Sequence, residues 1–105
     1  MPEILHITTP EKWEQAVANG EYRVESLETE GFIHFSTLKQ LPWVAESFYK
    51  DQKGLVVLRV DTERLTSPLK WENPPDSEDL FPHLYGPLNL DAVTKVESLE
   101  DVLAE

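Results

Sequence analysis

Three histidines are the side chains of this sequence best suited to proton transfer or metal binding, because the pKa of a free imidazole lies near neutrality. They stand in separate segments, as His6, His34 and His83. No H-E-x-x-H or H-x-H pair occurs, so a zinc site would need imidazoles brought together from all three segments. Two alternatives stay open: a three-histidine metal site, or ordinary histidines that hold the fold together.

Each histidine is followed two residues later by a hydroxyl side chain, which gives six positions: His6, Thr8, His34, Ser36, His83 and Tyr85. Where the chain is a strand, residues two apart lie on the same face. Small-ligand sites typically combine an apolar wall with a few polar groups of this kind. The six residues are therefore predicted to line a small-molecule pocket.

The sequence gives little support to other kinds of catalytic site. The chain has no cysteine, which excludes a thiolate nucleophile, a disulfide framework and cysteine-ligated metals. Ser36 lacks a glycine elbow and an obvious orienting acid, and no glycine-rich phosphate loop occurs. Among the many carboxylates, Glu72 beside Trp71 is a minor candidate for a catalytic acid.

Composition indicates one folded domain over residues 1–105. The chain is 40% hydrophobic, which is enough to form a core that needs no disulfide or metal for stability. Its formal charge of −11, with scattered basic residues, disfavours nucleic acid and anionic membrane surfaces as partners. The start has no signal-peptide pattern, and no apolar run approaches the ~18 residues that span a bilayer. A cytoplasmic location is expected.

Two main helices are predicted. Thr9 as N-cap and Pro10 as first helical residue begin the first, which ends near Asn19 before Gly20, with an inward stripe of Trp13, Ala16 and Val17. The second follows a cap at Ser36 or Thr37, with apolar positions up to Phe48. Pro42 is expected to kink this second helix or delay its start.

Strands are predicted at residues 4–7, 32–35, 55–60, 69–72 and 92–97, with the third of these central, and a short extended piece is expected at 21–24. Short helical turns are expected at 26–30, 61–65 and 98–105. Residues 73–79 read as a rigid acidic loop, and residues 80–90, with two prolines and a glycine, as an irregular segment that lines a pocket or a core edge. The fold class is α+β.

Three strings carry a resemblance to a known family: LHIT at 5–8, GEYRVESLETEGFIHFST at 20–37 and FPHLYGPL at 81–88. In order and spacing they resemble the short bacterial and plant proteins called domain of unknown function 952. The resemblance implies a compact domain similar to the catalytic core of ADP-ribosyltransferases and RNA 2′-phosphotransferases. Those enzymes bind NAD in a cleft between two small, mostly antiparallel sheets.

LHIT looks like the Y-H-G-T pattern on the first strand of those enzymes. The resemblance makes His6 the strand histidine that hydrogen-bonds the nucleotide ribose, with Thr8 on the same face. Ile7 stands where the pattern has glycine, and Leu5 where it has tyrosine. For the late-strand acid of those enzymes, three positions stay open: Glu72, Glu97, or Tyr85 as a neutral substitute.

Three functions follow from these observations. The leading one is a small-molecule pocket of ADP-ribosyltransferase-like shape for a nucleotide or NAD-like ligand. The second is a non-catalytic protein-interaction module, whose acidic surface meets a basic partner. The third is a metal-dependent hydrolase that uses the three histidines. The reaction, if there is one, and the oligomeric state are left open.

Overall fold

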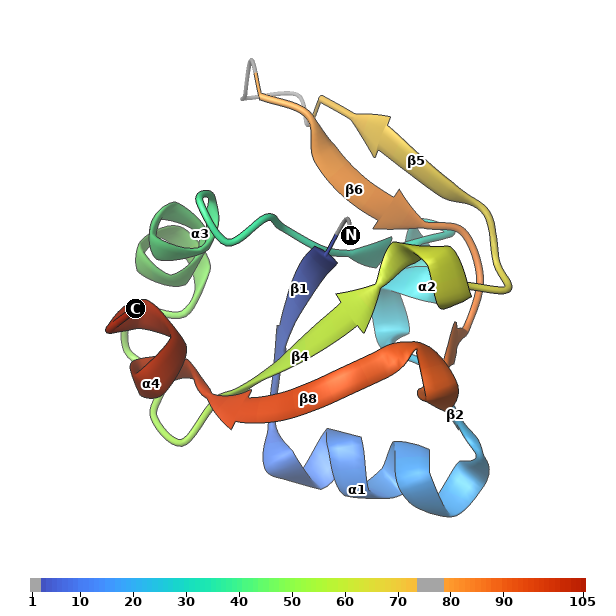
Figure 1. Ribbon diagram of the computed structural model, residues 1–105, viewed down its shortest axis with the longest axis horizontal. Helices are drawn as coiled ribbons and strands as arrows, with labels where there is room; N and C mark the ends of the chain where they lie inside the picture. Colours follow the sequence, from blue (N-terminus) through green and yellow to red (C-terminus); the bar gives the residue numbers. More distant parts are fainter. Residues whose placement is uncertain (1–2, 74–78) are drawn as a thin grey trace.

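The computed structural model describes residues 3–73 and 79–105 and confirms an α+β domain (Figure 1). One sheet holds, in spatial order, β1 (Glu3–Thr8), β4 (Val56–Asp61) and β8 (Val93–Ser98). A second sheet holds β3 (Ile33–His34), β6 (Phe81–Leu84) and β5 (Leu69–Glu72). All pairings are antiparallel. A separate two-stranded ribbon is formed by β2 (Glu21–Tyr22), within the extended piece expected at 21–24, and β7 (Leu88–Asn89), where no strand was expected.

The two three-stranded sheets meet at one point. Leu5 of β1 exchanges two backbone hydrogen bonds with Ser36, at 2.7 and 2.8 Å between nitrogen and oxygen. Phe35, one residue earlier, donates its N–H to the carbonyl of Pro82 in β6. The bridge is isolated: as β1 continues toward Thr8 and the other segment returns toward Ile33, no further backbone hydrogen bond joins them in the described chain.

The helix α1 (Pro10–Asn19) has the predicted ends. Its N-cap Thr9 accepts a hydrogen bond from the backbone nitrogen of Lys12, and Gly20 ends the helix with φ 87°, a conformation that glycine adopts without a steric penalty. The predicted inward stripe is wrong at Val17, which is 56% exposed, whereas Ala16 is buried. The stripe is narrower than the pattern suggested because α1 covers only one edge of the core.

The helix α3 (Leu41–Phe48) begins later than its apolar pattern. Thr37 and Gln40 bond each other's backbone nitrogens through their side chains, at 3.0 and 3.2 Å, and hold a turn before the helix. Pro42 then lies in the first helical turn, where a missing N–H costs no hydrogen bond. Of the two expected effects of Pro42, the delayed start is the observed one. Phe48, expected to face inward, is 65% exposed.

The prediction of an irregular segment at residues 80–90 is wrong, because the segment contains β6 and β7. All four residues of β6 are buried, and β6 pairs with β3 on one side and β5 on the other. Pro82 has no N–H to donate, but its carbonyl still accepts from Phe35 at 3.0 Å. Long-range pairing and burial thus override the local preference of proline for irregular structure.

The remaining expectations concern short elements. Predicted turns are present as α2 (Glu25–Thr29), the 3₁₀ turn at Thr62–Arg64 and α4 (Leu99–Leu103). A further 3₁₀ turn, Leu90–Ala92, precedes β8. Most of the predicted acidic loop, residues 74–78, lies outside the described residues. No helix in the described ranges combines the length and the apolar character needed to cross a membrane.

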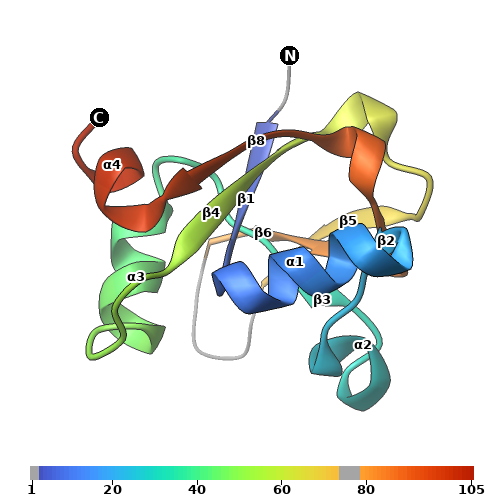
Figure 2. The same cartoon turned by 90° about the horizontal axis from the view of Figure 1, so that it is seen from below.

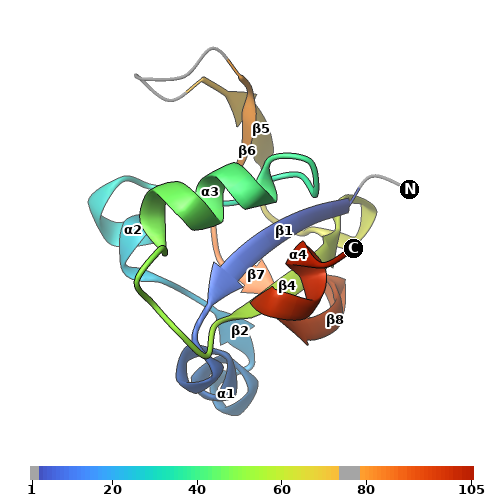
Figure 3. The same cartoon turned by 90° about the vertical axis from the view of Figure 1, so that its left-hand side faces the viewer.

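Two hydrophobic clusters lie on opposite faces of β1 and β4. One contains Ile4, Leu58 and Val60 with residues of α1, β2, β3 and β6. The other contains Leu5, Ile7 and Val57 with residues of α3 and α4. Figures 2 and 3 show α3 and α4 on one side of the first sheet and α1 on the other. Alternate residues of β1 therefore serve different cores, and His6 and Thr8 fall on the face of Ile4.

Candidate functional site in the cleft between two sheets

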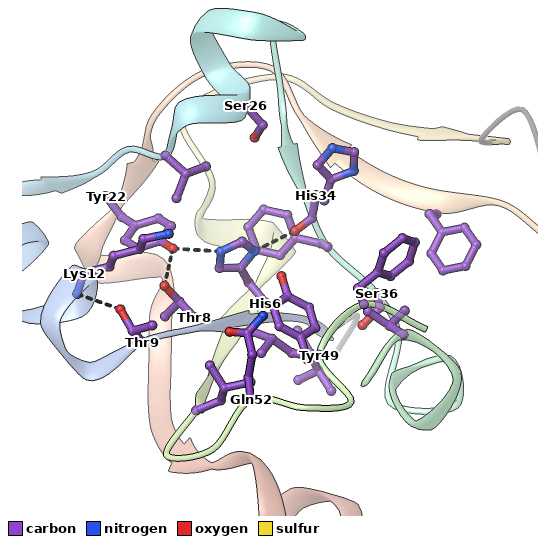
Figure 4. A pocket seen from close by; sticks show the side chains of 18 of the residues that line it. His6, Thr8, Thr9, Lys12, Tyr22, Ser26, His34, Ser36, Tyr49 and Gln52 are labelled. Atoms are coloured by element: carbon purple, nitrogen blue, oxygen red, sulfur yellow. Dashed lines mark hydrogen bonds between the residues drawn. The ribbon is translucent and has the colours of Figure 1, made fainter. Parts of the chain in front are cut away.

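A cavity of about 570 Å³ lies where β1 parts from the segment 33–36. Its walls are largely apolar and aromatic, and include Val24, Phe35, Val44, Tyr49, Leu55 and Phe81. The volume is within the range of about 300–1,000 Å³ typical of small-molecule sites. Figure 4 shows the polar side chains that reach this space from β1, β2, α1 and the segment after β3.

The floor of the cavity is a buried hydrogen-bond network. The Nδ1 atom of His6 lies 2.6 Å from the carbonyl oxygen of His34, and Nε2 lies 2.8 Å from the hydroxyl of Tyr22. That hydroxyl lies 2.7 Å from Oγ1 of Thr8. The dashed lines in Figure 4 follow this chain. His6 therefore connects β1 to β2 and to β3.

Burial determines which groups of this network are protonated at neutral pH. Burial lowers the pKa of His6 to about 4, although the bond to the His34 carbonyl acts in the opposite direction. At neutral pH the ring is uncharged, and Nδ1 carries the proton because a carbonyl only accepts. Burial also raises the pKa of Tyr22 to about 12, so its hydroxyl stays protonated at neutral pH. Both ring nitrogens of His6 are thus engaged, and neither is left for a ligand.

The free edge of β1 presents backbone groups to the same cavity. The bonds between Leu5 and Ser36 show that the N–H and C=O of Leu5 point away from β4. In an antiparallel strand the groups two residues on point the same way, so those of Ile7 face the cleft. Within the described ranges neither group has a hydrogen-bond partner. The side chain of Ile7 packs in the cluster with α3 and α4, away from the face of His6.

A second polar cluster occupies the face of β3, β6 and β5 that carries His34 and His83. These two residues are directly opposite in register, with ring centroids 5.3 Å apart. Nδ1 of His83 lies 2.9 Å from Oε1 of Glu72, and the Tyr85 hydroxyl donates to the same oxygen at 2.6 Å. Phe32 stacks on His83, with centroids 4.1 Å apart. The imidazole of His34 points away from His6, as Figure 4 shows.

The six predicted residues fall into two groups. The cavity is lined by five of them, His6, Thr8, His34, Ser36 and His83. Tyr85 is outside the lining. Its hydroxyl bonds Glu72, which also bonds His83, and its ring lies 5.2 Å from that of Phe32. Among the cavity residues that the sequence did not indicate, Tyr22 is the one that bonds His6. A tyrosine on a two-residue strand has no hydrophobic periodicity that would indicate its burial. The available signal was its position in the string GEYRVESLETEGFIHFST, which carries the family resemblance.

The candidate acids are in different places. Glu97 bonds to Arg59 on the first sheet, and this bond, more than the nearby charge, holds the pKa of Glu97 below its usual value. For Glu72 the same direction results chiefly from the Tyr85 hydroxyl and then from the His83 N–H. Neither acid lines the cavity.

A three-histidine metal site is contradicted by the geometry. Both nitrogens of His6 are bonded to protein groups. In residues 3–73 and 79–105, which include all the histidines, no three side chains of the metal-ligating types are placed to hold one ion.

Similarity to known proteins extends over nearly the whole chain. Residues 7–96 match the model of a family described as protein of unknown function (DUF952). The crystal structure of protein CC0527 from Caulobacter crescentus shares 32% sequence identity with a TM-score of 0.84, over 99% of this chain and 100% of that one. The solution NMR structure of CC0527 shares 34% identity with a TM-score of 0.79, over 93% and 84%. No curated protein matches.

Proposed function

The chain belongs to the DUF952 family of proteins of unknown function, and within it we propose that this protein is a small-molecule-binding domain whose cleft takes a nucleotide or NAD-like ligand. The observation that carries the proposal is the cavity between the two sheets, with the backbone edge of Ile7 exposed on its wall. An apolar cavity with a few convergent polar groups is the usual form of a small-ligand site.

The edge at Ile7 suits a carboxamide or a nucleobase. Its N–H donates and its C=O accepts, so a planar group that offers one acceptor and one donor satisfies both. A nicotinamide carboxamide and the edge of an adenine ring both have this pattern. Because the Ile7 groups are otherwise without a partner in the described chain, the ligand would satisfy them without breaking a bond within the protein.

Aromatic side chains on α3 and β6 supply stacking surfaces. Trp43 and Phe48 line the cavity although each is more than half exposed, and the Trp43 ring lies 5.8 Å from that of Phe81. Stacking of a base on an aromatic side chain contributes roughly 1–3 kcal/mol. At the other end Lys12 lines the cavity and offers a positive charge to a phosphate.

The ADP-ribosyltransferase-like arrangement is part of the proposal. It is supported by a cleft between two small antiparallel sheets and by a histidine on the first strand. The role carried over for His6 needs revision, because both of its nitrogens are bonded within the protein. We therefore assign His6 the task of holding the cleft in shape, and we propose ligand binding without a transfer reaction.

The test is thermal unfolding with NAD, ADP-ribose, AMP and nicotinamide, followed by calorimetric titration. A ligand at about 100 times its Kd should add roughly 2.7 kcal/mol to stability. Val24→Trp, which places an indole in the cavity, should abolish the shift, whereas Val17→Trp on the exposed face of α1 should retain it. If no ligand shifts the wild-type protein, the proposal fails and the interaction module becomes the better explanation.

A further inference from the structure

His83 differs from His6 in where its nitrogens point. His34 also bonds a carboxylate, with Nε2 3.1 Å from Oε2 of Glu30, but its side chain is exposed. The Nδ1 atom of His83 lies on the carboxylate of Glu72, which also accepts the Tyr85 hydroxyl. These two hydrogen bonds hold the pKa of Glu72 below its usual value, the Tyr85 bond contributing more, so the carboxylate is ionised at neutral pH and can only accept. Nδ1 of His83 must therefore carry the proton. In the neutral ring, Nε2 then has a free lone pair.

The Nε2 atom of His83 is accessible and has no partner among the described residues. Every buried side-chain nitrogen and oxygen in the described ranges has a partner, so an atom without one must be accessible to solvent. His83 lines the cavity, although its side chain as a whole is only 6% exposed. A nearly buried ring thus leaves its acceptor nitrogen accessible.

The neighbours of His83 restrict the direction from which a ligand reaches it. Phe32 stacks on one face of the ring with an interplanar angle of 20°, and His34 lies edge-on at 79°. Glu72 occupies the Nδ1 side. A ligand atom must therefore approach Nε2 close to the plane of the ring, the direction in which an imidazole accepts a hydrogen bond.

We propose that His83, oriented by Glu72 and Phe32, is a specificity-determining acceptor of the cleft, which selects ligands that bring a neutral N–H or O–H group on a planar ring. This inference rests on the proposed function, because it assigns a ligand class to the same cavity. It explains why a carboxylate and a second donor, Tyr85, are gathered behind an otherwise nearly buried imidazole. Carboxylates that orient histidines in this way fix the tautomer of the ring.

The probes are indole, which has an N–H donor and no conventional acceptor, and 1-methylindole, which has the same ring system without the donor. Titrations are followed by NMR, with the ¹⁵N signals of His83 as the local reporter. We expect indole to bind roughly three- to tenfold more tightly than 1-methylindole, as one net hydrogen bond allows. Only indole should move the Nε2 signal.

Two variants separate this role from a structural one. His83→Phe retains a ring for Phe32 to stack on but removes Nε2, and should bind both probes equally. Tyr85→Phe removes the second donor to Glu72 and leaves the His83 bond, so the preference for indole should persist. Folding of each variant is checked by circular dichroism.

The wild-type protein alone can overturn the proposal. Equal affinities for the two probes, an unmoved Nε2 signal, binding by neither probe, or a free-protein tautomer with the proton on Nε2 would each contradict it. If NAD or ADP-ribose still stabilises the protein and Val24→Trp still blocks that effect, the cleft stands and only the role of His83 fails. If neither result is obtained, the proposed function fails as well.

Discussion

The floor of the cleft and the face of the second sheet each hold a histidine among hydrogen-bonding neighbours, but they use it differently. His6 has protein partners on both nitrogens, whereas His83 has one partner and one open nitrogen. The first arrangement connects three strands, and the second orients a ring toward a space. Burial alone does not distinguish them, since both residues are less than a tenth exposed. The partner of each nitrogen indicates which histidine is structural and which is available to a ligand.

The largest effect should come from removing the structural histidine. His6→Ala leaves a buried carbonyl and a buried hydroxyl with fewer partners and creates a cavity, so it should lower the free energy of unfolding by about 3 kcal/mol or more. Chemical denaturation measures this loss. His83→Ala should cost clearly less, because its partners Glu72 and Tyr85 remain bonded to each other. Equal losses in the two variants would remove the distinction.

Acidification should also lower the free energy of unfolding, because it favours protonation of His6. The pKa of His6 is about 4 in the folded protein and about 6.5 when the chain is unfolded, so the unfolded state binds the additional proton first. Stability should therefore fall as pH drops from about 6.5 to 4, by up to about 3 kcal/mol from this group. Denaturation curves of wild type and His6→Gln across this window provide the check. A similar pH dependence in both proteins would contradict the assignment.

Tyr22→Phe should have a smaller effect on the same network. It removes one hydroxyl and leaves Nε2 of His6 without its buried partner, at a cost of about 1–3 kcal/mol. The matched control is Tyr85→Phe on the second sheet, whose hydroxyl bonds a partly exposed carboxylate and should matter little for stability. Thermal unfolding compares the two. A greater loss for the Tyr85 variant would reverse the proposed ranking of the two regions.

The smallest effect on stability should come from Glu72→Gln, which keeps a side-chain oxygen in place for His83. The substitution should instead change the tautomer of the His83 ring. A neutral amide holds the Nδ1–H tautomer less firmly than a carboxylate, so the ¹⁵N signals of His83 should move toward those of mixed tautomers while those of His6 stay unchanged. Unchanged His83 signals would show that Glu72 does not orient the ring.

Much of the fold followed from local sequence signals. Thr9, Pro10 and Gly20 correctly marked the ends of α1, because caps act within one turn of the chain. The strands at β1, β4 and β8 followed from their β-prone runs. The prolines of residues 80–90 led to a wrong prediction at β6, because its pairing with the distant Ile33 and His34 is not visible in any local pattern.

The features of the candidate site also divide into those set by local sequence and those set by tertiary contacts. The sequence by itself determined that each histidine has a hydroxyl residue two positions later, and that His6 and Thr8 share one face of a strand. Only the tertiary structure decided which imidazole nitrogens are occupied, that Tyr22 completes the floor, and that the backbone of Ile7 faces the cleft. The physical reason is that residue type and strand period are local properties, whereas a hydrogen-bond partner depends on which distant segment folds against each atom.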